Sequence, residues 1–234
     1  MKKSTSLILG ILTTIIIFGL GVTASRIIDL NSEFIPQVFL TQMIELTLSV
    51  FAIYLFAKSS TFKFKFQKVK FKYYMYGILF SLAGFLAAQI IATILIKVSG
   101  FELDPTGNGF SSISDMNALH FFLFVFISSS ICEEFLFRGF AQNFFEPLKS
   151  FGIRISKNIF ISVPVLLSGI LFGLAHLILL TSETSGPMVF RTVLFATTLG
   201  LIAGYFQEKH QSILPAIVIH MTGNLPGLII ISLL

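Results

Sequence analysis

Residues 118–139 have the sequence ALHFFLFVFISSSICEEFLFRG, an apolar run interrupted by two glutamates and an arginine. A helix that crosses a bilayer needs about 20 mainly apolar residues, so the length of this run predicts a membrane span. Ionisable side chains inside a span are costly, and each one is a functional hypothesis by default. The stretch therefore predicts a class of fold and also a place to look for chemistry.

The composition of the whole chain agrees with a membrane protein. Hydrophobic residues make up 55% of the 234 residues and charged residues 12%, against about 45–50% and about 25% in a soluble domain. The mean hydropathy is +0.91. These values exclude a soluble enzyme, a disordered chain and a small secreted disulfide scaffold, and the single cysteine, Cys132, cannot form an internal disulfide.

Six further apolar stretches are long enough to cross a membrane. Together with residues 118–139, the predicted spans are residues 7–25, 37–57, 74–97, 160–180, 188–206 and 213–233. The alternation of short segments that is typical of outer-membrane β-barrels does not occur. We therefore expect an all-α, polytopic bundle of about seven transmembrane helices, forming a single integral membrane domain over residues 1–234.

Basic residues predict the orientation, because cytoplasmic loops retain lysine and arginine. With the N-terminus inside, 13 of the 16 basic residues fall in inner segments, and only Arg26, Lys97 and Arg191 fall in outer ones. The expected topology has a cytoplasmic N-terminus and an external C-terminus, in the cell membrane if the protein is bacterial. Residues 1–25 also have the features of a signal peptide, but their length favours an uncleaved first helix.

The densest basic segment, Lys58–Lys72, alternates lysine with phenylalanine. A site for nucleic acid or for an acidic substrate is one interpretation of this segment and of the net charge of +5. A cytoplasmic loop whose lysines meet anionic headgroups is favoured. The expected partner is therefore the lipid bilayer, and no nucleic acid.

Glu133 and Glu134 cannot point in the same direction on a helix, since adjacent residues are about 100° apart. Glu134 and Arg138 are four residues apart and can form an ion pair on one face. Glu133 then points elsewhere, on the side of Ser129 and Ser130, as a candidate general base. The alternative is that both glutamates bind Arg138 as a structural triad.

A further glutamate, Glu45, falls inside the second predicted span. It shares one helical face with Gln42 and Ser49. Its place in a span makes it a functional candidate. A structural hydrogen-bonding role is favoured, because polar groups in spans pair between helices.

Two histidines in separate spans strengthen the catalytic interpretation. Phe172 and His176 share a helical face, and so do His220 and Asn224. A carboxylate base, two imidazoles and an amide can activate water, orient it and donate a hydrogen bond to an oxyanion. Together these residues predict a hydrolytic site inside the membrane.

Other types of catalytic site lack the residues that they need. All three aspartates, Asp29, Asp104 and Asp115, fall in predicted outer loops, which excludes a membrane aspartyl protease pair. Neither an H-E-x-x-H zinc motif nor a G-x-S-x-G nucleophile elbow occurs. Cys132 faces about 100° away from Glu133 and is interpreted as an inert buried residue.

Three motifs follow one another on separate spans: E-E-x-x-x-R at Glu133, F-x-x-x-H at Phe172 and H-x-x-x-N at His220. In this order they resemble the CAAX prenyl endopeptidase and bacteriocin-processing family of intramembrane proteases (CPBP, or Abi). That family is related to the eukaryotic Ras-converting endopeptidase. The part of the chain that carries the motifs covers about residues 115–230.

The resemblance implies two groups of site residues. The catalytic residues would be Glu133, which activates water, with His176, His220 and Asn224. The supporting residues would be Glu134, Arg138 and Phe172. The substrate would be a hydrophobic or lipid-modified peptide, or a membrane-associated protein.

The family is often labelled as metalloproteases, although a glutamate-and-water mechanism without metal is also argued for its relatives. If zinc is bound, Glu133, His176 and His220 would be its ligands, with water in the fourth position. Metal-independent water activation is favoured, because a metal-bound Glu133 would leave no second acidic base nearby. No cofactor is therefore firmly required, and a divalent metal stays open as the alternative.

Two other functions stay open for the same residues. One is a non-catalytic or protease-dependent membrane protein of bacteriocin immunity or regulation. The other is a small transporter whose buried Glu and His residues carry protons. No inverted repeat supports a transporter, and the composition of the site favours hydrolysis near the cytoplasmic face.

The main difficulty for this site is that its residues are predicted to lie at different depths in the membrane. From the predicted boundaries, Glu133 lies near the inner end of its span, His176 near the outer end of its own, and His220 closer to the inner end. Convergence requires tilted helices, or a fourth helix that continues past Arg138 with residues 140–158 along the inner surface.

Overall fold

The computed structural model describes residues 3–30, 32, 34–57, 64, 66–101, 117–181 and 184–233. Within them, seven helices are long and apolar enough to cross a membrane: Lys3–Ile27, Gln37–Phe56, Phe71–Val98, Ala118–Gln142, Val163–Thr181, Gly186–His210 and Leu214–Leu233. They coincide with the seven predicted spans to within a few residues at each end. The expectation of an all-α bundle is confirmed, and the chain is an integral, multi-pass membrane protein.

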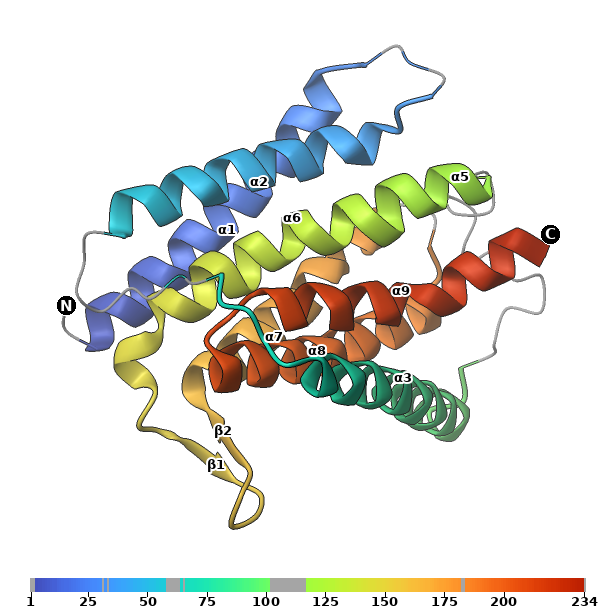
Figure 1. Cartoon of the computed structure of the whole chain (residues 1–234). Helices are drawn as coiled ribbons and strands as arrows, with labels where there is room; N and C mark the ends of the chain where they lie inside the picture. Colours follow the sequence, from blue (N-terminus) through green and yellow to red (C-terminus); the bar gives the residue numbers. More distant parts are fainter. Residues whose placement is uncertain are drawn as a thin grey trace.

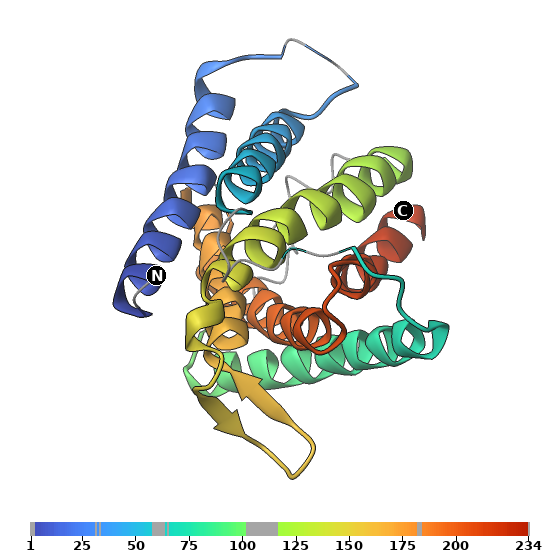
Figure 2. The ribbon, with the colours of Figure 1, turned by 60° about the vertical axis from the view of Figure 1, so that its left-hand side comes forward.

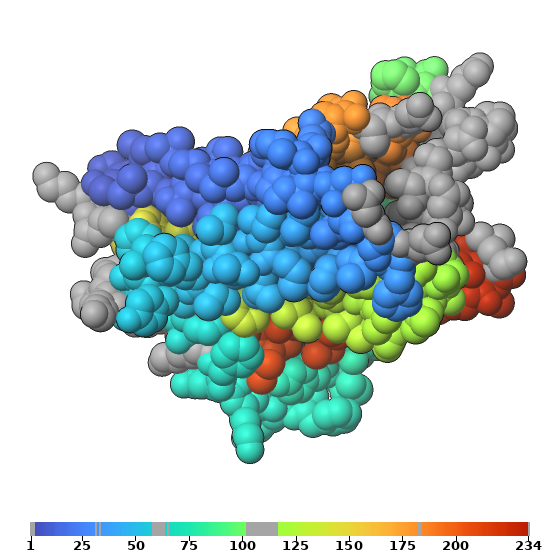
Figure 3. Space-filling view, turned by 90° about the horizontal axis from the view of Figure 1, so that it is seen from above, coloured from blue at the N-terminus to red at the C-terminus, as the bar shows by residue number. Residues whose placement is uncertain are grey.

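The fourth span is the centre of the bundle. It runs as one continuous helix with four segments: α5 (Ala118–His120), the π-helical η2 (Phe121–Ser129), α6 (Ser130–Glu134) and the π-helical η3 (Phe135–Gln142). Helices α1 (Lys3–Ile27) and α2 (Gln37–Phe56) pack together on one side of it (Figure 1). Seen from above, this pair covers one broad face of the molecule (Figure 3).

Three further helices lie on the other side of the fourth span. Helix α9 (Leu214–Leu233) packs directly against it, and α8 (Gly186–His210) and α3 (Phe71–Val98) lie behind α9 (Figure 2). Helix α7 (Val163–Ala175) packs against both η3 and α8. The side chains of the fourth span can therefore meet groups from α2, α7 and α9.

The polarity of the bundle is reversed relative to a soluble protein. Large apolar side chains such as Ile16 and Phe80 are more than half exposed, whereas Glu134 and Arg138 are fully buried. An unsatisfied polar group is costly in hydrocarbon, so this pattern fits helices that face lipid around a closed polar centre.

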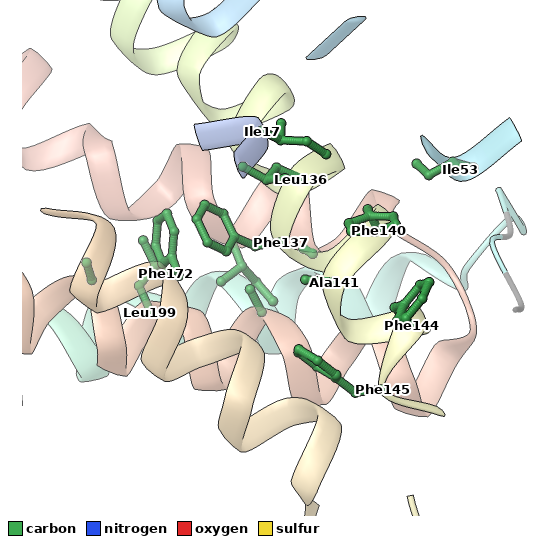
Figure 4. Close-up of a cluster of buried hydrophobic side chains, with 14 of the residues drawn as sticks. Ile17, Ile53, Leu136, Phe137, Phe140, Ala141, Phe144, Phe145, Phe172 and Leu199 are labelled. Atoms are coloured by element: carbon green, nitrogen blue, oxygen red, sulfur yellow. The ribbon is translucent and has the colours of Figure 1, made fainter. Parts of the chain in front are cut away.

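A phenylalanine-rich cluster surrounds the end of the fourth span. Phe137, Phe140, Phe144 and Phe145 belong to it (Figure 4), and each is at most 3% exposed. The helix does continue past Arg138, which is one of the two arrangements expected to let the site residues converge. The expectation that the following residues lie along the inner surface is wrong for their first part, because these aromatic side chains form the core.

A short β-hairpin follows, which the sequence did not lead us to expect. Strand β1 (Gly152–Arg154) pairs in antiparallel fashion with β2 (Phe160–Ser162). Ser162 then caps α7 by accepting a hydrogen bond from the Val165 N–H, which satisfies a donor of the first turn. The helix therefore begins three residues after the predicted start of this span.

One end of the bundle gathers the N-terminus, the end of α2 and the hairpin (Figure 1). The lysine-rich segment 58–72 connects α2 to α3 from this same end, and its residues 58–63 and 65 lie outside the described part of the chain. The predicted orientation places these segments on the same side of the membrane, and the structure groups them in this way. That this side faces the cytoplasm stays a prediction.

Candidate active site

The fourth span presents its two adjacent glutamates to different surroundings. Glu134 is fully buried, and its Oε1 lies 3.2 Å from Arg138 Nη1 in the predicted ion pair. The Glu133 side chain stays 21% exposed, and it accepts a hydrogen bond from the Ser129 hydroxyl. The geometry thus separates a paired carboxylate from one that faces open space.

His220, on α9, lies between the two glutamates. Its Nδ1 is 2.9 Å from Glu134 Oε1, and its Nε2 is 3.9 Å from Glu133 Oε2. A carboxylate only accepts hydrogen bonds, so Nδ1 carries a proton and donates it to Glu134. Glu134 therefore orients the ring and turns Nε2 toward Glu133. Sequence reasoning missed this contact.

Phe172, on α7, holds both histidines in place. Its ring makes edge-to-face contacts with the rings of His220 and His176, at centroid distances of 5.3 and 5.1 Å. The Phe172 carbonyl lies 2.9 Å from His176 Nδ1, so that nitrogen is the donor and Nε2 is the acceptor. His176 stands where α7 tightens into the 3₁₀ turn η5 (His176–Thr181).

Glu133 and His176 line one cavity of about 360 Å³. Its wall also includes Glu45 of α2 and several residues of α1. An adjoining apolar cavity of about 250 Å³ lies between α1 and α7 and shares Phe18 and Phe137 with the first. The volumes suit a short piece of peptide with an apolar group beside it.

The cavity lies in the half of the bundle away from the lysine-rich segment. It is lined by the last half of α1, the first half of α2 and the start of η5. These parts adjoin the connections at residues 28–36 and 182–185. Under the predicted orientation this is the outer half of the membrane. If that orientation holds, access is from the bilayer or the outer side, and not from the cytoplasmic side that the sequence led us to expect.

Arg138 is completely buried between α7 and α8. Its guanidinium carbon lies 4.6 Å from the centroid of the Phe172 ring. A Cβ at Gly200 would lie 2.9 Å from Arg138 Nη2, so glycine makes room for the side chain on α8. Its side-chain nitrogens have no hydrogen-bond partner among the described residues, which leaves Glu134 as the group that balances its charge.

Asn224 lies one turn beyond His220 on α9. Its Nδ2 donates to the Val125 carbonyl and to Ser130 Oγ, at 3.2 Å in each case. Both acceptors belong to the fourth span, so Asn224 ties α9 to the helix that carries the glutamates. Neither Asn224 nor His220 is among the described residues that line the cavity.

The metal ligands left open by the sequence are Glu133, His176 and His220. In the described ranges, no group of three or more His, Cys, Asp or Glu side chains is arranged to hold a metal ion. The Phe172 ring contacts both histidine rings, and His220 Nδ1 is bonded to Glu134. These three side chains would have to move to share one ion.

Residues 115–226 match the family model of the Rce1-like type II CAAX prenyl endopeptidases. The chain is related to this family. The match contains all three motifs and supports a CAAX-protease-like enzyme of the membrane, as the resemblance implied. No curated protein and no solved structure gives a significant match.

The Rce1-like segment carries the motif residues but only part of the cavity wall. Helices α1, α2 and α3 precede it in the chain. Of these, α1 and α2 supply nine of the cavity-lining residues: Phe18, Val22, Ser25, Arg26, Gln37, Val38, Thr41, Gln42 and Glu45. The part of the chain outside the match thus shapes the space that a substrate would enter.

Glu45, for which the sequence favoured a structural role, lines the cavity together with Glu133. Its Oε1 has no hydrogen-bond partner among the described residues, and the same holds for Ser49 Oγ. On this face of α2, Gln42 does bond, to the Phe124 carbonyl at 3.1 Å. The structural hydrogen bonding favoured for Glu45 is therefore not found in the described part of the chain. A glutamate inside a span was the available signal.

Proposed function

We propose that this chain is an intramembrane endopeptidase that hydrolyses a peptide bond in a hydrophobic or lipid-modified peptide, with Glu133 as the base that activates water. The observation that carries the proposal is a cavity shared by Glu133 and His176, beside a His220 ring that Glu134 orients. The relationship to the Rce1-like endopeptidases supports the same reaction class.

The chemistry starts with a water molecule in the cavity. Glu133 accepts a proton from it while the water oxygen bonds to the substrate carbonyl carbon. His176 Nε2 accepts the second hydrogen bond of this water and orients it. The oxyanion that forms needs a donor, and His220 supplies one at Nε2 when it carries a second proton.

The adjoining apolar cavity adds a second requirement for the substrate, which is an apolar group beside the peptide bond. It lies between α1 and α7 and is lined by Thr14 and otherwise by apolar side chains. An apolar chain that enters from the bilayer can occupy it while the peptide bond reaches Glu133. A lipid-modified or strongly apolar peptide therefore fits the two cavities better than a polar one.

Cleavage of a farnesylated, internally quenched CAAX peptide by the purified protein in nanodiscs tests the proposal. We expect the wild-type protein to cleave it, and Glu133→Gln to lower kcat by about 100- to 10,000-fold, the usual contribution of a general base. Abundance and thermal midpoint should stay near wild type. Ser128→Ala is the matched control, since Ser128 contacts Cys132, and its activity should be unchanged.

Retained cleavage by Glu133→Gln would contradict the role of this residue. The same preparation is analysed for zinc, because a bound metal would change the role of Glu133 in the reaction. We expect activity to survive strong chelators. One zinc per chain, lost together with activity in His176→Ala and restored by added metal, would make Glu133 a ligand or a metal-assisted base instead.

A further inference from the structure

A second carboxyl group faces the cavity from α2. Glu45 is 2% exposed and lines the cavity together with Glu133 and His176. Helix α1 leaves room for it, because a Cβ at Gly21 would lie 3.0 Å from Glu45 Cγ. Glu45 is thus buried against α1 and reaches the cavity from a helix outside the Rce1-like match.

The surroundings of Glu45 do not balance a negative charge. Within the described residues, its Oε1 accepts no hydrogen bond. Arg26 is the cation on the wall of the same cavity, but its guanidinium donates to Thr181 Oγ1. Burying a carboxylate without a partner is costly, and a second carboxylate on the same cavity adds repulsion.

Glu133 and Glu45 therefore differ in the protonation state that their surroundings favour. Glu133 has the Ser129 hydroxyl as a hydrogen-bond donor and a side chain that stays 21% exposed, so it is the better place for the negative charge. Glu45 is better buried as the neutral acid. A site with one carboxylate and one carboxylic acid can both accept and donate a proton.

Hydrolysis of an amide needs one group that accepts a proton and one group that donates a proton. The base removes a proton from water, and the amine leaves readily only if its nitrogen receives a proton as the C–N bond breaks. The motif residues supply the base, the water-orienting imidazole and the oxyanion donor. A separate acid is the group that they do not include.

We propose that Glu45 is the catalytic acid of this site, which rests on the hydrolytic function proposed above. As the oxyanion re-forms the carbonyl, the C–N bond breaks and the Glu45 proton goes to the leaving nitrogen. Glu133, protonated by the attacking water, then returns its proton to Glu45 through water in the cavity. One water is consumed, and both carboxyl groups regain their starting forms.

Two probes that differ in the leaving group test this role. One is the farnesylated CAAX peptide amide, and the other is a p-nitrophenyl ester of the same farnesylcysteine, whose leaving group departs without a proton. We expect Glu45→Gln to lower kcat for the amide by at least about 100-fold and for the ester by less than about threefold. Glu133→Gln should lose both reactions, because both need activated water.

Ser49→Ala is the matched control on the same face of α2. Ser49 is buried and unbonded among the described residues, like Glu45, but does not line the cavity, and neither reaction should change. If Glu45→Gln does not fold, Glu45→Asp keeps the acid on a shorter side chain. This variant should then slow the amide reaction selectively and by a smaller factor.

The outcomes separate this role from the proposed function. Equal loss of both reactions in Glu45→Gln at wild-type abundance would overturn the acid role in favour of substrate binding. Unchanged amide cleavage would overturn it as well. A wild-type protein that cleaves neither probe would instead refute the proposed hydrolysis, and the role of Glu45 with it.

Discussion

The cavity side and the packed side of the fourth span use the same kinds of residue for different purposes. On the cavity side, Glu133 bonds to Ser129 and stays 21% exposed. On the packed side, Glu134 is fully buried against Arg138 and His220. One residue step, about 100° around the helix, separates a carboxylate that can meet a substrate from one that holds helices together.

This difference gives the E-E-x-x-x-R motif two parts. The first glutamate is placed for chemistry, and the second joins the arginine and a histidine from another helix into one buried group. The short α6 segment that carries both glutamates is flanked by the wide turns of η2 and η3. Such π-helical turns occur often at functional sites.

The largest expected effect on the packed side comes from Glu134→Gln. The substitution leaves Arg138 buried without its counter-charge, at a cost of about 3–5 kcal/mol in the free energy of unfolding. We expect low abundance and a lower thermal midpoint in detergent, whereas Glu133→Gln should be close to wild type in both. Activity lost to the same extent in both variants at unchanged abundance would remove the distinction between the two sides.

The seven spans were predictable because each is a long apolar run and the bilayer sets its length. The Glu134–Arg138 pair was predictable because helix geometry brings residues four apart together. The β-hairpin was not predicted, since its strands have three residues each and the apolar stretch from residue 160 resembled the start of a helix.

The contacts between distant helices could not be deduced from local patterns. That His220 bonds Glu134, and that Glu45 shares the cavity of Glu133, depends on which faces of α2, α6 and α9 meet. The preference for a metal-free site was based on the lack of a second acidic group near Glu133. Glu45 removes that premise, so the preference now depends on measurement of the metal.

Asn224→Ala should have an intermediate effect, because Asn224 acts from the packed side. Its amide nitrogen already donates to Val125 and Ser130, and loss of both bonds should cost about 1–3 kcal/mol of stability. We expect a lower thermal midpoint with kcat reduced less than tenfold. The role of oxyanion donor expected from the sequence predicts the reverse: about a 100- to 1000-fold loss in kcat with unchanged stability.

Ser129 and Ser130 offer the finest test, since they repeat the contrast of the two glutamates with smaller groups. Ser129 donates to Glu133 on the cavity side, and Ser130 accepts from Asn224 on the packed side. We expect Ser129→Ala to lower kcat about 10- to 100-fold, because a hydrogen bond to a charged group contributes about 1.5–3 kcal/mol, with little change in thermal midpoint. Ser130→Ala should lower stability by about 1 kcal/mol and leave kcat near wild type. If the two variants exchange these effects, the cavity side and the packed side have been assigned the wrong way round.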